Sequence, residues 1–329
     1  MKVVVCHQHR FELWRAPEWL TERLRSQFRD VQFFHLHSYD DLEAQIGDAD
    51  VLIGWSIRPE QFAKAMRLRW IHSPAAAVHQ LMYPELIASE VHITNAGSVH
   101  GPVVAEHAIA MVLALAKGLP AAMRYQQEHR WAQQSMWSGA EAQRPREVAG
   151  ATLALIGLGS IGCEVARRAR ALGMRVIAVR EHPERGAQTA NEVVGRDQLH
   201  HVLAEAEYVV LAAPVTDATT AIINAETLRK MRSDAYLINV SRGALVDEAA
   251  LLRALREGTI AGGALDVLAQ EPLPPDSPLW EAPNLLITPH TAAVTAKLWE
   301  RHFELIRENL RRFLDGEPLL SEVDKHRRY

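Results

Sequence analysis

Three residues able to bind anions or move protons follow apolar, strand-like segments in the second half of the chain: Arg242, Glu271 and His290. In an open parallel sheet the carboxyl ends of the strands meet at one edge, so we expect these side chains to face one cleft. A histidine can deliver a proton near neutral pH, and a carboxylate on its other ring nitrogen fixes the tautomer and favours the protonated form. An arginine can bind a carboxylate and polarise a carbonyl. The set suits hydride transfer to a 2-oxo acid, with His290 protonating the alkoxide, Glu271 as its partner and Arg242 binding the substrate.

Each of the three residues also has a simpler interpretation. Arg242 could pair with Asp247 on the surface, Glu271 could cap the proline-rich turn at 272–275, and His290 could be a hydrogen-bonded core histidine. Their joint position at strand ends, beside a nucleotide-binding pattern, favours the catalytic interpretation.

The nucleotide-binding pattern lies at 151–162, where an apolar run ends in Gly157, Gly159 and Gly162. Gly157 permits a tight turn, Gly159 lets a pyrophosphate approach the backbone, and Gly162 lets a helix pack on the strand. A helical pattern follows, and then a second strand at Arg175–Val179. This order of strand, glycine turn, helix and strand predicts a dinucleotide site at a helix N-terminus.

Arg180 stands at the end of that second strand, where an acidic residue would bind the hydroxyl groups of the adenosine ribose. A guanidinium cannot accept those hydrogen bonds, but it can bind a 2′-phosphate, and Arg185 lies in the same loop. We therefore expect NADP, with NAD as the other possible cofactor. The alternative is that Arg180 is solvated and Glu181 turns inward to the ribose.

Strand-like and helix-like segments alternate along the whole chain, which is typical of parallel sheets covered by helices. We expect two doubly wound α/β domains: a substrate-binding domain from residues 1–100 and 292–329, and a Rossmann nucleotide-binding domain from residues 101–291. A long apolar helix is expected to start at Gly101–Pro102, and an amphipathic helix at Thr295–Leu314 is expected to return to the first domain. In that first domain the loop Ser73–His79 follows a strand, and its small side chains leave N–H groups accessible to an anion, unless it is a plain tight loop.

The composition is that of an ordinary globular protein: 329 residues, 48% hydrophobic, with a formal net charge of −4. Basic residues are scattered among acidic ones, so we expect no nucleic-acid partner. The most apolar window, Ala108–Ala116, is too short to span a bilayer, and no signal-peptide core follows Met1. With Cys6 and Cys163 both placed like small buried residues, the expected location is the cytoplasm, with no membrane contact.

Two pairs of alternate histidines, His7 with His9 and His35 with His37, could each share a strand face. Neither pair is accompanied by a cluster of cysteines or carboxylates, so we expect no metal site. His7 follows the first strand, and it could line the cleft instead.

Four segments resemble the D-isomer-specific 2-hydroxyacid dehydrogenase family, and in particular its NADP-type glyoxylate/hydroxypyruvate reductases. They are Gly157–Gly162, Asn239–Gly243 with Leu245–Asp247, Ala264–Val267 with Glu271–Pro272, and Thr288–Ala292. The resemblance implies Arg242 as the substrate-binding arginine and His290 with Glu271 as the acid–base pair. It places a further set of residues near the cofactor, with Asp266 close to the nicotinamide amide: Ser160, Ile161, Pro214, Thr219, Val240 and Asp266.

The resemblance also bears on the first domain, for which it implies a flavodoxin-like fold into which the Rossmann domain is inserted. Ala76, Ala77 and Val78 match the carboxylate-binding loop of the family, although Ala77 and His79 depart from its usual Gly and Asp. The family dimerises through the helix corresponding to Pro102–Lys117, so a homodimer is expected.

The expected activity is transfer of a hydride between NADP(H) and a small 2-oxo or D-2-hydroxy acid. Two other functions remain open. One is a non-catalytic, nucleotide-sensing protein of the co-repressor type, which the presence of Arg242, Glu271 and His290 disfavours. The other is a formate or phosphite dehydrogenase on the same scaffold, where a proton donor is less central, so the pair of Glu271 and His290 favours a carbonyl substrate.

Overall fold

The computed structural model describes residues 1–138, 144–185 and 188–325, and for Arg185 it describes the backbone alone. The chain divides into two compact units, one of Met1–His100 with Val294–Tyr329 and one of Gly101–Ala293. The boundaries expected from the sequence fell at residues 100 and 292.

The first unit is a five-stranded, all-parallel sheet with the strand order β2-β1-β3-β4-β5. This is the flavodoxin-like order. The strands are β1 (Lys2–Cys6), β2 (Gln32–His35), β3 (Val51–Gly54), β4 (Trp70–His72) and β5 (His92–Thr94). The helices are α1 (Glu18–Gln27), α2 (Leu42–Gln45), α3 (Pro59–Phe62), α4 (Pro84–Ala88) and α12 (Leu298–Asp315).

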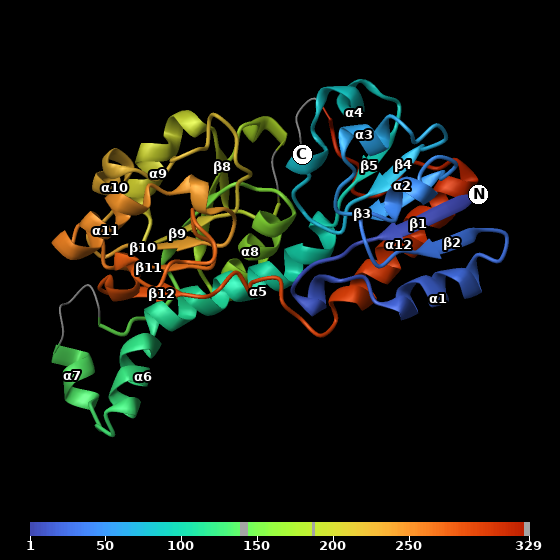
Figure 1. The fold of residues 1–329 in the computed structure, drawn as a ribbon. Coiled ribbons are helices and arrows are strands. Elements are labelled where there is room, and N and C mark those ends of the chain that lie inside the picture. Colours follow the sequence, from blue (N-terminus) through green and yellow to red (C-terminus); the bar gives the residue numbers. More distant parts are fainter. Residues whose placement is uncertain (139–143, 186–187, 326–329) are drawn as a thin grey trace. The chain divides into compact units, whose positions relative to one another are not determined.

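Successive side chains of β1 point to opposite faces of the sheet, which explains the two layers of helices in this unit (Figure 1). Val3 and Val5 face the cluster built with α1 and α12, whereas Val4 and Cys6 face the cluster built with α2 and α4. Because successive side chains of a strand point to opposite faces, a strand that is apolar throughout must be covered on both sides.

The second unit is a seven-stranded, all-parallel sheet with the order β12-β11-β10-β9-β6-β7-β8. Counted from β6, this is the Rossmann order with a seventh strand added at one edge. The strands are β6 (Thr152–Ile156), β7 (Arg175–Val179), β8 (Glu192–Val194), β9 (Tyr208–Leu211), β10 (Tyr236–Asn239), β11 (Gly262–Leu265) and β12 (Leu285–Ile287). The helices are α6 (Leu119–Gln127), α7 (Gln133–Ser138), α8 (Ser160–Ala171), α9 (Leu199–Glu205), α10 (Ala225–Lys230) and α11 (Glu248–Glu257). The expected fold class, two parallel-sheet α/β domains, is therefore confirmed.

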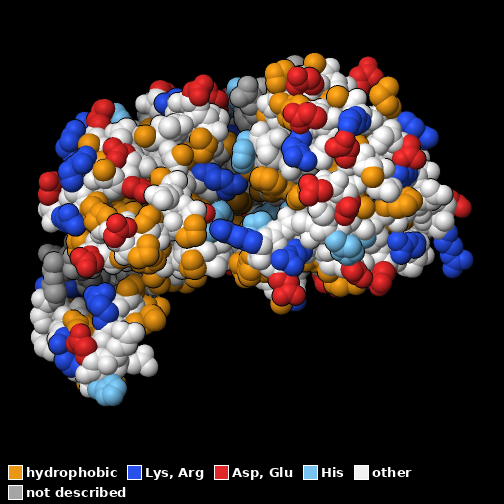
Figure 2. Space-filling view, in the orientation of Figure 1, with side chains coloured by type: hydrophobic (Ala, Val, Ile, Leu, Met, Phe, Trp, Pro, Cys, Tyr) orange, Lys and Arg blue, Asp and Glu red, His pale blue; other side chains and the backbone are white. Residues whose placement is uncertain are grey.

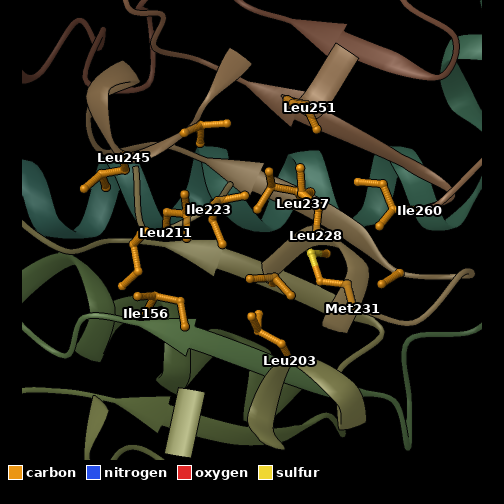
Figure 3. Close-up of a cluster of buried hydrophobic side chains, with 14 of the residues drawn as sticks. Ile156, Leu203, Leu211, Ile223, Leu228, Met231, Leu237, Leu245, Leu251 and Ile260 are labelled. Atoms are coloured by element: carbon orange, nitrogen blue, oxygen red, sulfur yellow. The ribbon is translucent and has the colours of Figure 1, made fainter. Parts of the chain in front are cut away.

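One face of the second sheet forms a core with α9, α10 and α11. Figure 3 shows Ile156, Leu211 and Leu237, which come from three neighbouring strands, among the side chains of this core. The opposite face packs against α8 and against α5 (Gly97–Ala116), whose buried residues include Ala108 and Val112.

The helix α5 begins earlier than the sequence predicted. Its expected start was Gly101–Pro102, but it starts at Gly97, so Pro102 lies inside it. An interior proline costs about 3 kcal/mol or more because one helical hydrogen bond is lost. Two features favour the longer helix: Asn95 Oδ1 accepts the N–H of Gly97, and Val99 and His100 are buried. By length and composition α5 could cross a membrane, yet 61% of its most apolar window is buried inside the protein.

The surface has two further features. Figure 2 shows acidic and basic side chains interspersed over the visible face. In the second unit α6 and α7 stand away from the sheet (Figure 1), and the segment that they form carries exposed large apolar side chains: Leu119, Met123, Trp131 and Trp137. We call residues 119–138 the arm.

Candidate active site

The glycine turn connects β6 to α8 as predicted. Gly157 has a φ of +101°, and a Cβ there would lie 2.6 Å from the backbone of Ala213. A Cβ on Gly162 would lie 2.2 Å from the carbonyl oxygen of Gly157, so the helix is packed directly against the turn. A Cβ on Gly159 would meet nothing within 4 Å. The first and third glycines are therefore required by the fold itself, whereas the second leaves open space beside the helix N-terminus.

That open space lies where a dinucleotide is expected to bind. Ser160 is exposed and Ile161 half-buried in the first turn of α8, whose N–H groups can bind a pyrophosphate. The order of the sheet reverses between β6 and β9, and ligands of such sheets bind at that crevice. The loop after β9 is closed by Thr219, whose hydroxyl donates to Pro214 O at 2.7 Å and accepts the N–H of Thr216 at 2.8 Å. The residues present thus fit a dinucleotide, and the individual contacts of Pro214 and Thr219 with it stay predictions.

Arg180 is half-buried directly after β7, and its N–H donates to Val194 O at 3.0 Å. Glu181, the alternative partner of the ribose, is exposed. The side chain of Arg185 lies outside what the structure describes. Recognition of the ribose by Arg180 stays a prediction.

A buried asparagine holds the turn that carries Arg242 after β10. Asn239 is fully buried; its amide nitrogen donates to Arg242 O at 2.9 Å, and its amide oxygen accepts the N–H of Ser241 at 3.1 Å. The Ser241 hydroxyl donates to Ala213 O at 2.5 Å, which ties this turn to the loop after β9. Val240 is buried between these two residues. Sequence reasoning gave Asn239 and Ser241 no role, although their polar side chains at the end of an apolar strand were a signal for one.

The guanidinium of Arg242 donates from Nη1 to Ser241 O at 2.6 Å. Burial lowers the pKa of Arg242, and the negative charge of Glu271 opposes that effect. The surface pair with Asp247 does not form, because the Asp247 carboxylate caps α11 by accepting the N–H of Ala250 at 2.9 Å.

Glu271 and His290 form a close pair. Glu271 Oε2 lies 2.6 Å from His290 Nδ1, and Glu271 Oε1 accepts the N–H of Leu268 at 2.9 Å. The side chains are 35% and 41% exposed, so His290 is not a core histidine. Since Glu271 bonds His290 and its charge acts on Arg242, the structure brings the three predicted catalytic residues together around one carboxylate.

His290 has a backbone φ of +53°, a left-handed conformation that is uncommon for residues other than glycine. Its N–H points at Asp266 O, 2.9 Å away. The Asp266 side chain, predicted to lie near the nicotinamide amide, is 1% exposed and accepts the N–H groups of Thr291 and Ala292. Contact with the cofactor stays a prediction, but Asp266 also holds the segment around His290, a role that the sequence did not predict.

In the first unit, the loop after β4 is held by its carbonyl groups. Three consecutive oxygens accept hydrogen bonds from a neighbouring segment: Pro74 O from His100 Nε2 at 3.1 Å, Ala75 O from Ala96 N at 3.0 Å, and Ala76 O from Asn95 Nδ2 at 3.1 Å. Within the part of the chain that the structure describes, no hydrogen bond engages the N–H groups of Ala76, Ala77 and Val78. These donors are therefore available to an anion, which is the role predicted for them.

A group of buried histidines lies in the same unit: His7, His72, His100 and His302. The rings of His100 and His302 are 5.5 Å apart, and Trp299 lies 4.9 Å from His302 and 5.9 Å from His7. Burial, with a smaller contribution from His9, lowers the pKa of His7 to about 4. Burial first, then the charge of His7, lowers the pKa of His72 to about 3, and burial with the neighbouring histidines lowers that of His302. His7 is thus buried, and its place in the cleft stays a prediction.

The alternate histidines have protein partners. His35 Nδ1 lies 2.7 Å from Thr21 Oγ1, and His9 Nδ1 accepts the N–H of Phe11 at 3.0 Å. Among the described residues, no group of three or more His, Cys, Asp or Glu side chains is arranged to hold a metal ion.

Comparison with known proteins gives three kinds of match. A family model described as "D-isomer specific 2-hydroxyacid dehydrogenase, NAD binding domain" matches residues 109–292. A glyoxylate reductase of Korarchaeum cryptofilum is 35% identical over 280 residues, covering 83% of this chain and 82% of that protein. A D-isomer-specific 2-hydroxyacid dehydrogenase of Xanthobacter autotrophicus, solved with NADPH and MES, superposes with a TM-score of 0.83 at 29% identity over 99% of both chains. An NADPH-dependent glyoxylate/hydroxypyruvate reductase of Sinorhizobium meliloti, solved with NADP and sulfate, gives a TM-score of 0.81 at 26% identity over 100% of this chain and 99% of that one.

Proposed function

Because the chain belongs to the D-isomer-specific 2-hydroxyacid dehydrogenase family, we propose that it reduces a small 2-oxo acid to the D-2-hydroxy acid, or catalyses the reverse reaction, with NADP(H). It is an oxidoreductase with an NAD-binding domain. The observation that carries the proposal is the 2.6 Å contact between Glu271 and His290, next to Arg242 and at the carboxyl ends of Rossmann strands.

The protein groups divide the chemical work. A nicotinamide cofactor, when bound, would supply the hydride for the carbonyl carbon. Arg242 binds the substrate carboxylate and polarises the carbonyl, and its burial strengthens that charge interaction. His290 would donate its Nε2 proton to the carbonyl oxygen of the substrate, while Glu271 on Nδ1 stabilises the imidazolium that exists before the transfer. In the reverse direction His290 takes the proton from the hydroxyl group.

NADP is the cofactor that we assign. Arg180 supports this assignment, because a guanidinium at the end of β7 suits a 2′-phosphate and cannot accept bonds from ribose hydroxyls. The NADP and NADPH complexes of the two similar structures agree with it.

For the substrate we assign the N–H groups of Ala76, Ala77 and Val78 to carboxylate binding. The support is that the carbonyl groups of this loop are occupied by Asn95, Ala96 and His100, which leaves the N–H groups as its available polar atoms. Glyoxylate and hydroxypyruvate are the first candidates, since both are small 2-oxo acids and the similar proteins are named for them.

We further assign a homodimer, with the arm as part of its interface. Trp131 is 93% exposed, and Met123 and Trp137 are about 60% exposed. Apolar side chains gathered in this way on a projecting segment are expected to be covered by another protein surface. A cytoplasmic location stays a prediction.

One panel of assays tests the proposal. The purified protein is incubated with glyoxylate, hydroxypyruvate, pyruvate and a branched or aryl 2-oxo acid, each with NADPH and with NADH. We expect turnover of at least one acid, a preference for NADPH and formation of the D isomer. If no acid is reduced while NADPH still binds, the proposal fails, and either a nucleotide-sensing binding protein or a formate or phosphite dehydrogenase takes its place. A His290→Ala variant is the background control.

A further inference from the structure

A chain of hydrogen bonds links helix α5 to the segment that carries His290. His107 Nε2 lies 3.0 Å from Thr288 Oγ1, and that hydroxyl donates to Asp266 Oδ1 at 2.6 Å. A hydroxyl group has one proton, so Thr288 can only accept from His107. His107 therefore carries its proton on Nε2, and the bonds run from His107 through Thr288 to Asp266. His107 Nε2 also lies 3.5 Å from Asp266 Oδ1.

Asp266 in turn holds the backbone on both sides of His290. Its Oδ1 also accepts the N–H of Thr291 at 2.9 Å, and its Oδ2 accepts the N–H of Ala292 at 3.0 Å. The backbone oxygen of Asp266 accepts the N–H of His290 at 2.9 Å. The carboxylate is 1% exposed, so water does not compete for these bonds.

The backbone of His290 requires such support. A φ of +53° costs a residue with a Cβ free energy, and it persists where the surrounding structure over-determines it. This conformation directs the imidazole toward Glu271, which its Nδ1 meets at 2.6 Å. A change in the orientation of the Asp266 carboxylate would release the neighbouring N–H groups and shift the ring.

We propose that His107 is a positioning residue that, through Thr288 and Asp266, fixes the backbone and therefore the ring of His290. The kinetic part of the inference rests on the function proposed above. A structural role alone, as one more residue of the α5 core, is the competing explanation, because the His107 side chain is only 23% exposed.

Two pairs of variants separate these explanations. Thr288→Val and His107→Leu remove the chain of bonds, whereas Thr288→Ser and His107→Gln keep a hydroxyl and an N–H donor. We expect the first pair to lower kcat by up to about 100-fold with KM for the 2-oxo acid and affinity for NADPH within about twofold, because the acid is misplaced rather than lost. The second pair should retain most of the activity.

The double variant tests whether the two residues act together. Because Thr288→Val and His107→Leu interrupt the same series of hydrogen bonds, the double variant should be no slower than the slower single variant. Unchanged kcat, multiplying losses in the double variant, or a loss in His107→Gln as large as in His107→Leu would overturn the inference. So would a loss of NADPH affinity with unchanged kcat, which would assign the chain to cofactor binding.

Hydrogen exchange gives a readout that does not depend on turnover. We expect amide exchange in peptides covering residues 288–292 to be faster in Thr288→Val and His107→Leu than in the wild type, by about 10-fold, and unchanged in peptides covering β6. If the wild-type protein reduces no 2-oxo acid, the proposed function fails and exchange alone decides the positioning role. Equal exchange at residues 288–292 in the variants and the wild type would overturn it.

Discussion

Glu271 holds His290 with one carboxylate oxygen and its own loop with the other: Oε2 lies 2.6 Å from His290 Nδ1, and Oε1 accepts the N–H of Leu268 at 2.9 Å. The carboxylate is thereby fixed before it meets the imidazole. A carboxylate oriented in this way selects the tautomer with a proton on Nδ1, and the proposed function assigns proton exchange with the substrate to Nε2.

Replacement of Glu271 by Gln should lower kcat by about 10- to 100-fold, because a neutral amide does not stabilise the positive imidazole from which the proton leaves. Affinity for NADPH, measured by fluorescence titration, should stay within about twofold. The matched control is Glu281→Gln, at an exposed glutamate near the same loop. Equal kcat in both variants would remove Glu271 from the acid–base pair.

Replacement of His290 by Gln should remove most of the turnover in both directions, a loss of about 100-fold or more, since general acid–base catalysis of this kind contributes about 10² to 10⁴. Cofactor affinity should be close to normal because this residue is assigned to the substrate side of the reaction. Initial rates with the best 2-oxo acid of the panel measure the effect. Turnover close to that of the wild type would show that another group delivers the proton.

The pattern of the sequence was enough to predict two parallel-sheet domains and the glycine turn. The strand at Arg175–Val179 has the bounds that the sequence predicted, and the apolar run that ends at Gly157 forms β6, because such runs are local signals. The same holds for Arg242, Glu271 and His290, which follow strands whose ends must meet at one edge of a parallel sheet.

The supports of the site could not be predicted in the same way. Asp266 and Thr288 are 22 residues apart, and His107 is 181 residues from Thr288, so their contacts depend on how separate strands and a helix pack. The hydrogen bonds from Asn95 and His100 to the loop after β4 also join residues that are far apart in the sequence. They depend on α5 starting at Gly97 rather than at Pro102. Propensity and periodicity describe one element at a time, and these contacts join several.

Replacement of Arg180 by Asp should shift the cofactor preference from NADPH toward NADH. The carboxylate repels a 2′-phosphate and accepts bonds from the ribose hydroxyl groups, and each effect is worth on the order of 1–3 kcal/mol. The ratio of kcat/KM values for the two cofactors should therefore change by about 10-fold or more. Glu181→Gln is the control at the adjacent position. A ratio that changes in the control but not in Arg180→Asp would assign the ribose to Glu181.

The buried histidines of the first unit should make its stability depend on pH. The pKa of His7 is about 4 in the folded protein and that of His72 about 3, against 6.5 for an exposed histidine. Between pH 6.5 and 4 the unfolded chain therefore binds more protons than the folded one, so stability is complete above pH 6.5 and is lost as the pH falls toward 4. The expected loss between pH 7.5 and 5 is on the order of 2 kcal/mol for each of His7 and His72. Urea unfolding at the two pH values, followed by tryptophan fluorescence, measures this loss of unfolding free energy.

Two variants test whether the buried rings cause the loss. His302→Met removes one buried titrating ring and should reduce the loss, whereas His201→Ala, at a side chain that is 69% exposed, should leave the loss unchanged. A wild-type protein equally stable at both pH values would mean that these rings are protonated in the folded state as readily as in water.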